Sequence, residues 1–198
     1  MDGKREMQIQ KLNKQSGFTL VEIAIVLVII GLLLGGVLKG QEMIKNAEIR
    51  SVITDVQGLT TAMYAYRDRY NAIPGDDAAA IVNSSSATGV LNGDGDGVIE
   101  YSGSDVEDDQ FFLQLRAANL LKGAGTTGPT HSLGGSFSVQ TDTYGLSGLV
   151  FCTSAVDGGD ALIIDTKEDD GVMITGSIRG GTTGAYASGT AVSLCFEG

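Results

Sequence analysis

The chain has 198 residues and a formal net charge of −11, with 24 acidic and 13 basic side chains. Beyond residue 70 only four residues are basic, namely Arg116, Lys122, Lys167 and Arg179. This part of the chain repels phosphate backbones, which excludes nucleic-acid binding through it. With 29 glycines and no tryptophan, we expect one loop-rich globular domain with a single core, and no large catalytic scaffold.

The first 17 residues are polar and charged, and they contain no apolar run. The run Gly17-Phe18-Thr19-Leu20-Val21-Glu22 then opens a stretch of 21 residues, 18–38, in which Glu22 is the only charged residue. As a helix this stretch would be about 31 Å long, which matches the hydrocarbon core of a bilayer. We therefore expect residues 18–38 to form a transmembrane segment.

Glu22 is an unusual residue in such a segment. An acidic residue near the centre of a membrane helix costs about 2.5–3.5 kcal/mol, and less near its end, so Glu22 needs a cationic partner. Cleavage after Gly17 would supply one, because it frees the α-amino group of Phe18. An ordinary secretory signal has its apolar stretch before the cleavage site, whereas here it follows and would stay on the mature protein. A plain signal anchor with a chance glutamate is the alternative.

This arrangement resembles the prepilin signal of type IV pilins and of the pseudopilins of type II secretion, closely over residues 14–40 and more loosely to about Tyr70. The resemblance implies that a membrane peptidase cuts after Gly17 and methylates Phe18, and that Glu22, the fifth mature residue, serves assembly. Loss of residues 1–17 removes four basic and two acidic side chains, so the mature chain has a net charge of −13.

Residues 39–70 are expected to continue the helix in amphipathic form. Apolar residues recur there every three or four positions: Ile49, Val52, Ile53, Val56, Leu59, Met63, Tyr66 and Tyr70. The pattern stops before Pro74 and Gly75, which end helices. The first half of this helix belongs in lipid or among identical helices, and the second half packs against its own head, residues 71–198.

Glycines are frequent near the middle of this helix, at Gly31, Gly35, Gly36 and Gly40. They favour close packing between helices through small residues. The resemblance offers a second interpretation, because pilin helices unwind locally in this region on assembly. Lys39 stands where such pilins often have a proline, so both interpretations stay open.

A candidate calcium loop occupies residues 92–100. Oxygen-bearing side chains occupy alternate positions at Asn92, Asp94 and Asp96. Counted from Asn92 as in an EF-hand loop, Gly97 is at position six, Val98 at position seven could bind through its carbonyl, and Glu100 is at position nine. The twelfth position is a glycine, so the bidentate glutamate of an EF-hand is missing. Asp105, Glu107 or Asp108 could replace it, and we favour Glu107. The alternative is an acidic turn without an ion, although uncompensated carboxylates would repel one another.

The rest of the head is expected to be a short helix followed by a sheet. Ser104 and Glu107 form a capping box for a helix that ends at Gly123. Residues 71–132 thus form a loop region with a calcium loop and a helix, and residues 133–198 a sheet region. Its short β-prone runs are Ser136–Gln140, Leu146–Thr153, Met173–Ile178 and Ala191–Phe196.

The sheet region also contains a segment of ambiguous secondary structure, an acidic turn and two cysteines. Residues 161–166 are either a strand or a short helix capped by Asp160, and residues 167–171 form an acidic turn that is solvated or holds a metal. Cys152 and Cys195 favour a disulfide in an exported head, with two free thiols as the alternative. Type IV pilins often carry such a C-terminal bridge. His131, the only histidine, has no nucleophile-and-base set around it, so we do not expect an enzyme.

We therefore expect an α+β fold: a long N-terminal helix, transmembrane then amphipathic, packed on a small antiparallel sheet, as in pilins. The resemblance implies a major or minor subunit of a type IV pilus-like filament. A type II secretion pseudopilin and a calcium-dependent adhesin on a pilin-type anchor are the alternatives. Expected partners are like subunits, the prepilin peptidase and the assembly machinery. The precursor would lie in the bacterial inner membrane, and the product in an extracellular filament or a periplasmic pseudopilus.

Overall fold

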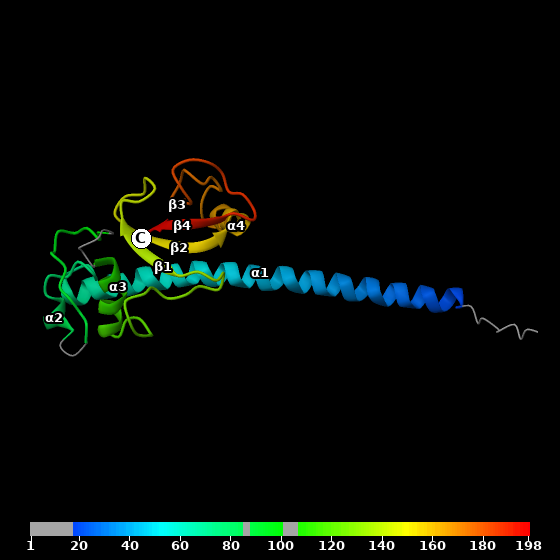
Figure 1. Ribbon diagram of the computed structural model, residues 1–198, viewed down its shortest axis with the longest axis horizontal. Helices are drawn as coiled ribbons and strands as arrows, with labels where there is room; N and C mark the ends of the chain where they lie inside the picture. The colour runs from blue at the N-terminus through cyan, green and yellow to red at the C-terminus, as the bar shows by residue number, and fades with distance from the viewer. Residues whose placement is uncertain (1–17, 85–87, 101–106) are drawn as a thin grey trace, which may run out of the picture. The chain divides into compact units, whose positions relative to one another are not determined.

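The computed structural model describes residues 18–84, 88–100 and 107–198, and it has the expected α+β arrangement (Figure 1). The helices are α1 Leu20–Tyr70, α2 Ala80–Asn83, α3 Glu107–Ala117 and α4 Gly158–Glu168. The strands are β1 Phe137–Thr141, β2 Leu149–Asp157, β3 Ile178–Arg179 and β4 Ala191–Glu197. The contacts divide the chain into two compact units between Ile44 and Lys45, so α1 contributes to both.

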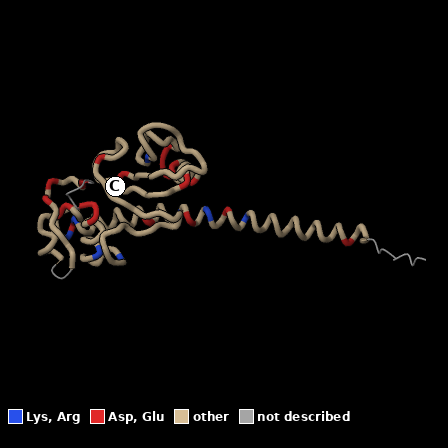
Figure 2. The backbone as a smooth tube through the Cα atoms, in the orientation of Figure 1, with Lys and Arg blue, Asp and Glu red and all other residues tan. Residues whose placement is uncertain are grey.

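The first unit contains the apolar part of α1. Every side chain from residue 18 to residue 38 is exposed in the isolated chain, and the helix is long and apolar enough to cross a membrane. Figure 2 shows how few charged residues this part of the helix carries. An apolar helix that its own chain leaves bare needs lipid or another helix as its surroundings.

The second unit, which we call the head, packs the second half of α1 against a four-stranded antiparallel sheet of order β1-β2-β4-β3. The buried face of α1 matches the sequence pattern: Ile49, Val52, Val56, Leu59, Ala62, Met63 and Tyr66. Phe111 and Leu115 of α3 and Phe151 of β2 complete the core. The last strand, β4, lies inside the sheet between β2 and β3. The C-terminal segment is therefore part of the core of the head.

The ends of two helices differ from the sequence expectation. The helix α3 ends at Ala117 and not at Gly123, because Asn119 adopts φ 58° and the Leu120 N–H bonds back to the Leu115 carbonyl. The N-cap of α4 is Asp157, whose carboxylate accepts a 2.8 Å hydrogen bond from the Gly159 N–H. Asp160 is not the cap and instead forms an ion pair with Lys45 of α1. The proposed capping residue Ser104 lies outside the described residues.

Residues 161–166 lie within α4, so they form a helix and not a strand. The expected strand Met173–Ile178 is wrong: only Ile178–Arg179 form β3. Residues 172–175 turn instead, with the Thr175 N–H bonded to the Val172 carbonyl and the Gly180 N–H to that of Met173. The end of α1 is as predicted, because Asn71 takes a positive φ of 54° directly before the turn at Pro74.

Candidate functional site

The start of α1 is capped by a threonine. Thr19 accepts hydrogen bonds from the Glu22 N–H through both Oγ1, at 3.3 Å, and its carbonyl, at 3.1 Å. Glu22 thus lies in the first turn, where the unsatisfied N–H groups favour a carboxylate. Sequence reasoning missed this role of Thr19, although the spacing Thr19-x-x-Glu22 is that of a capping box.

Phe18 directly precedes the capped turn, and its side chain is 78% exposed. It is four positions before Glu22 in sequence and lies outside the helix, which begins at Leu20. Between residues 18 and 38 no basic side chain accompanies Glu22, and the next one along the chain is Lys39. Gly17, the expected cleavage position, lies outside the described residues. A free amine on Phe18 would be the positive charge nearest in sequence to this carboxylate.

Three carboxylates from two segments of the head converge in what we call the acidic cluster. One carboxylate oxygen from each of Asp76, Asp94 and Asp96 lies within 4.8 Å of the others. Two oxygens that bind the same Ca²⁺ at about 2.4 Å can be up to about 4.8 Å apart, so this donor set fits calcium. Sequence reasoning missed Asp76, because the segment Pro74-Gly75-Asp76 was interpreted only as a helix stop.

Asp76 is the most buried member of the cluster, with 4% of its surface exposed. Its Oδ1 accepts from the Gly95 N–H at 2.7 Å, and its Oδ2 from the Gly97 N–H at 2.9 Å. Burial raises the pKa of Asp76, and the Asp96 and Asp94 carboxylates act in the same direction. Two backbone N–H groups of the loop thus stabilise the negative charge of Asp76, whereas burial and the two neighbouring carboxylates oppose it.

Glu107, at the start of α3, faces the same loop. Its Oε1 accepts from the Asp94 N–H at 3.2 Å and its Oε2 from the Glu100 N–H at 3.4 Å. Burial raises the pKa of Glu107, and Asp76 and Asp94 contribute further. Asp108, the next residue, lines a separate cavity beside Phe112, and Asp105 lies outside the described residues. Of the three proposed substitutes for the twelfth ligand, Glu107 contacts the loop in the structure.

The other predicted ligands hold the loop in shape. The Asn92 side-chain oxygen accepts from the Ile81 N–H at 2.9 Å, which ties the loop to α2. Asp94 Oδ1 accepts from the Asp96 N–H at 3.0 Å, and Asp96 Oδ1 from the Val98 N–H at 2.8 Å. These are Asx turns, which bend the loop and keep one oxygen of each carboxylate occupied.

Close backbone contacts bring the segments of the site together. A Cβ on Gly93 would collide with the backbone of Asp76. At Gly75, which has φ +93°, a Cβ would lie 2.5 Å from the Glu107 carbonyl oxygen. Both positions require glycine, because the turn at residue 76, the loop and the start of α3 touch through their main chains. The resulting site offers several fixed oxygens and can hold a hard cation.

A second acidic group lies at the C-terminal end of α4 and consists of Asp165, Asp169 and Asp170. Asp165 is fully buried and accepts from the Tyr186 hydroxyl at 2.6 Å and the Gly171 N–H at 2.9 Å. Asp169 accepts from the Ile178 N–H, and Asp170 from the Thr175 hydroxyl. These bonds organise the turn between α4 and β3, so the turn is more ordered than a purely solvated run of charge.

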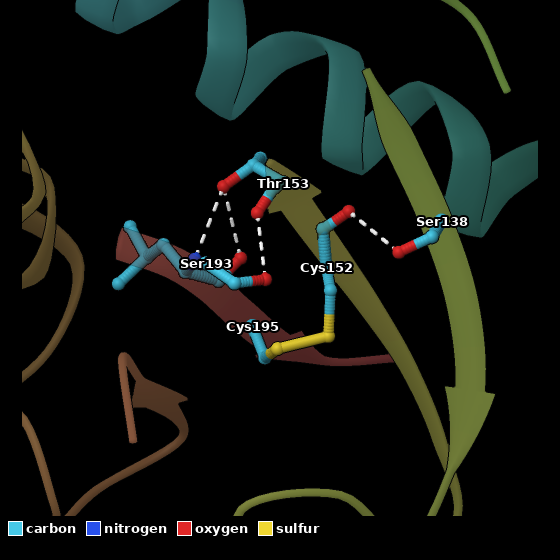
Figure 3. The surroundings of a disulfide bond; sticks show 6 residues. Ser138, Cys152, Thr153, Ser193 and Cys195 are labelled. Carbon is cyan, nitrogen blue, oxygen red and sulfur yellow. Dashed lines mark hydrogen bonds between the residues drawn. A yellow bond between two sulfur atoms is a disulfide. The ribbon is translucent and has the colours of Figure 1, made fainter. Parts of the chain in front are cut away.

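The two cysteines form a disulfide between β2 and β4, as predicted (Figure 3). Cys152 and Cys195 are direct register partners and are 2% and 1% exposed. Beside them the Thr153 hydroxyl donates to the Leu194 carbonyl at 3.0 Å, and the Ser193 hydroxyl to the Thr153 carbonyl at 2.8 Å (Figure 3). The bridge therefore fastens the last strand inside the sheet.

Comparison with known proteins identifies the N-terminal segment. Residues 12–38 match the family model of the prokaryotic N-terminal methylation motif, which is the prepilin signal of type IV pilins and pseudopilins. No curated protein and no solved structure matches the chain. The motif includes Gly17, Phe18 and Glu22, and it supports a pilin-like or pseudopilin protein.

Proposed function

We propose that this chain is a structural subunit of a type IV pilus-like filament, assembled through α1 after cleavage between Gly17 and Phe18. The observation that carries the proposal is the position of Glu22. It is the single charge of the apolar stretch, and it lies in the capped first turn of α1, four positions after Phe18 in sequence. In a lipid-like filament core, the Glu22 carboxylate pairs with the Phe18 amine of a neighbouring subunit, where the attraction is little screened.

The bare surface of the first unit supports assembly through this helix. Side chains 18–38 are all exposed in the isolated chain, so lipid would cover them before assembly and identical helices afterwards. An added Cβ at Gly31, Gly35 or Gly36 would meet no atom within 4 Å. These glycines leave room for another helix to approach closely.

A pseudopilin of type II secretion is the second candidate, because the same methylation motif serves both kinds of filament. In either case the precursor is an inner-membrane protein processed by the prepilin peptidase and handled by the inner-membrane assembly machinery. The product is then an extracellular filament or a periplasmic pseudopilus. Imaging of the cell surface with and without this protein distinguishes them, since only a pilus subunit adds long surface filaments.

We further propose that the head binds Ca²⁺ as a structural ion. Asp76, Asp94 and Asp96 would supply carboxylate oxygens, the Val98 carbonyl would supply another, and Glu107 would complete the site. Asn92 and Glu100, the other two ligands predicted from the sequence, stay predictions. Burial, and to a smaller extent the Asp96 and Asp94 carboxylates, raise the pKa of Asp76, and such a cation would offset both effects. It would order a glycine-rich loop with little apolar side-chain area of its own. A calcium-dependent adhesin on the same anchor would use the same ion at a binding surface.

Filament incorporation of Glu22 variants tests the proposed function. Glu22→Ala should be processed and should keep a folded head, but its incorporation into sheared filaments should fall strongly. Asp68→Ala, which removes an exposed carboxylate from the head part of the same helix, is the matched control and should assemble normally. Equal filament yields from the two variants would contradict the role of Glu22.

A further inference from the structure

A groove of about 450 Å³ lies on the head between α1 and the paired strands β3 and β4. Its apolar lining consists of the half-buried Ile53 and of the more deeply buried Val56, Ile178 and Phe196. Two exposed carboxylates, Glu168 at the end of α4 and Glu197 at the end of β4, stand at its rim. Over residues 18–84, 88–100 and 107–198, neither carboxylate forms an ion pair. The groove therefore suits an apolar side chain accompanied by a positive charge.

The first unit carries an apolar side chain and a positive charge together on one face of α1. Lys39 and Gly40 each lie three or four positions from both Gly36 and Met43, so the four residues share one face of the helix. Met43 is 65% exposed although it lies beyond the apolar stretch. Among the described residues, Lys39 forms an ion pair with Glu42, and both side chains are largely exposed to solvent, so Lys39 can exchange this partner for another carboxylate at little cost.

The distribution of charge favours contacts between a head and another copy's α1. Residues 18–70 carry five basic and five acidic side chains, whereas residues 71–198 carry four basic and 17 acidic. Figure 2 shows the acidic residues gathered on the head. Contacts between two heads are therefore electrostatically repulsive, whereas a contact between a head and the neutral helix of a neighbouring copy is not.

We propose that the groove receives the Lys39–Met43 face of α1 from a second copy of this chain. The Met43 side chain would enter the apolar lining, and Lys39 would pair with Glu168 or Glu197 at the rim. Gly36 and Gly40 would let the rim approach the helix, since an added Cβ on either would meet no atom within 4 Å beyond the adjacent residues and the local helix backbone. This inference rests on the proposed filament and specifies which surfaces meet in it.

Cysteine cross-linking in filaments of the full chain tests the contact. The native cysteines are paired and buried, so they do not interfere. Met43→Cys combined with Ser177→Cys, whose serine lines the groove, should give a ladder of linked copies after mild oxidation. Each single variant should give no ladder. The control pair of Met43→Cys with Ser147→Cys, an exposed loop residue of the head that does not line the groove, should link several-fold less.

Charge reversal gives an independent test of the same contact. Glu168→Lys together with Glu197→Lys should lower filament yield several-fold, and adding Lys39→Glu should restore much of it. Normal wild-type filaments without the Met43–Ser177 ladder, or a triple variant no better than the double variant, would overturn this inference and leave the proposed function standing. Failure of the wild-type chain to enter any filament would overturn both.

Discussion

The hydroxyl of Tyr66 donates a 2.7 Å hydrogen bond to Oδ2 of Asp77, and both residues are buried. The same Oδ2 accepts from the Asn83 side chain, and Asp77 Oδ1 accepts from the Ala79 N–H. Burial raises the pKa of the Tyr66 phenol, and Asp77 adds to the shift, so the hydroxyl keeps its proton. This bond fastens α1 to the turn that carries Asp76, the buried member of the acidic cluster.

We predict that Tyr66→Phe destabilises the head by about 1–3 kcal/mol, because a buried carboxylate loses one of its donors. Urea unfolding of the soluble head measures this. Tyr64→Phe, which changes a half-exposed tyrosine on the same helix, is the control and should stay within about 0.5 kcal/mol of the wild type. If both variants unfold at the same urea concentration as the wild type, the Tyr66–Asp77 bond contributes nothing measurable.

Calcium should raise the melting temperature of the head, since an ion that binds only the folded state stabilises it by mass action. With no bidentate glutamate at position twelve, we expect weak affinity, on the order of 10⁻⁴–10⁻³ M. Asp94→Ala with Asp96→Ala should remove the response, and Asp76→Asn should weaken it strongly. Asp170→Asn, in the second acidic group, should leave it intact. If calorimetry gives the same melting temperature with calcium and with chelator, the head does not bind a structural calcium ion.

Loss of the disulfide should cost the head about 4 kcal/mol, because the bridge closes a loop across 43 positions of sequence. Cys152→Ser with Cys195→Ser removes both thiols at once, so no free cysteine confuses the result. Because β4 is an inner strand of the sheet, we expect the whole head to unfold earlier in denaturant, and not only its C-terminus. A variant whose unfolding midpoint equals that of the oxidised wild type would refute this estimate.

His131 should make the head less stable in acid. Its Nδ1 accepts from the Leu133 N–H, and its Nε2 lies 3.0 Å from the Ser154 carbonyl, so the neutral ring fits as an Nε2–H donor. Burial lowers the pKa of His131 below its usual 6.5. Between that lowered value and pH 6.5 the unfolded chain binds the extra proton, so stability is lost as the pH falls through this window.

Unfolding of His131→Gln measures the histidine contribution separately from that of the many carboxylates. Its free energy of unfolding should change less than that of the wild type between pH 7.5 and pH 5. Lys122→Gln, which changes an exposed loop residue, is the control and should keep the wild-type dependence of the free energy of unfolding on pH. Identical pH profiles for the wild type and His131→Gln would show that the ring does not titrate in this range.

Local pattern was enough to predict the main elements of this fold. The buried face of α1 follows the spacing of three and four that starts at Ile49, and Pro74 with Gly75 marks its end. The pairing of Cys152 with Cys195 followed from an even number of cysteines in an exported head. Each of these features depends on neighbouring residues or on composition, so no knowledge of the tertiary structure was needed.

The features that sequence reasoning missed depend on contacts between distant segments. Asp76 joins Asp94 and Asp96 only because the turn after α1 packs against the loop through Gly93. Asp160 was a plausible helix cap, but Lys45 of α1 binds it in the folded head. Residues 172–175 have strand propensity, yet hydrogen bonds from Thr175 and Gly180 fold them into turns. Tertiary contacts override local propensity at these positions.

Mass spectrometry of the chain recovered from sheared filaments tests the central claim most directly. The account predicts a mature protein that begins at Phe18, carries one methyl group on its amine and is enriched in the filament fraction. Gly17→Val should keep the chain as an uncut precursor in the membrane, because a Cβ at this position hinders the approach of the peptidase. Recovery of the assembled protein with residues 1–17 still attached would contradict the account.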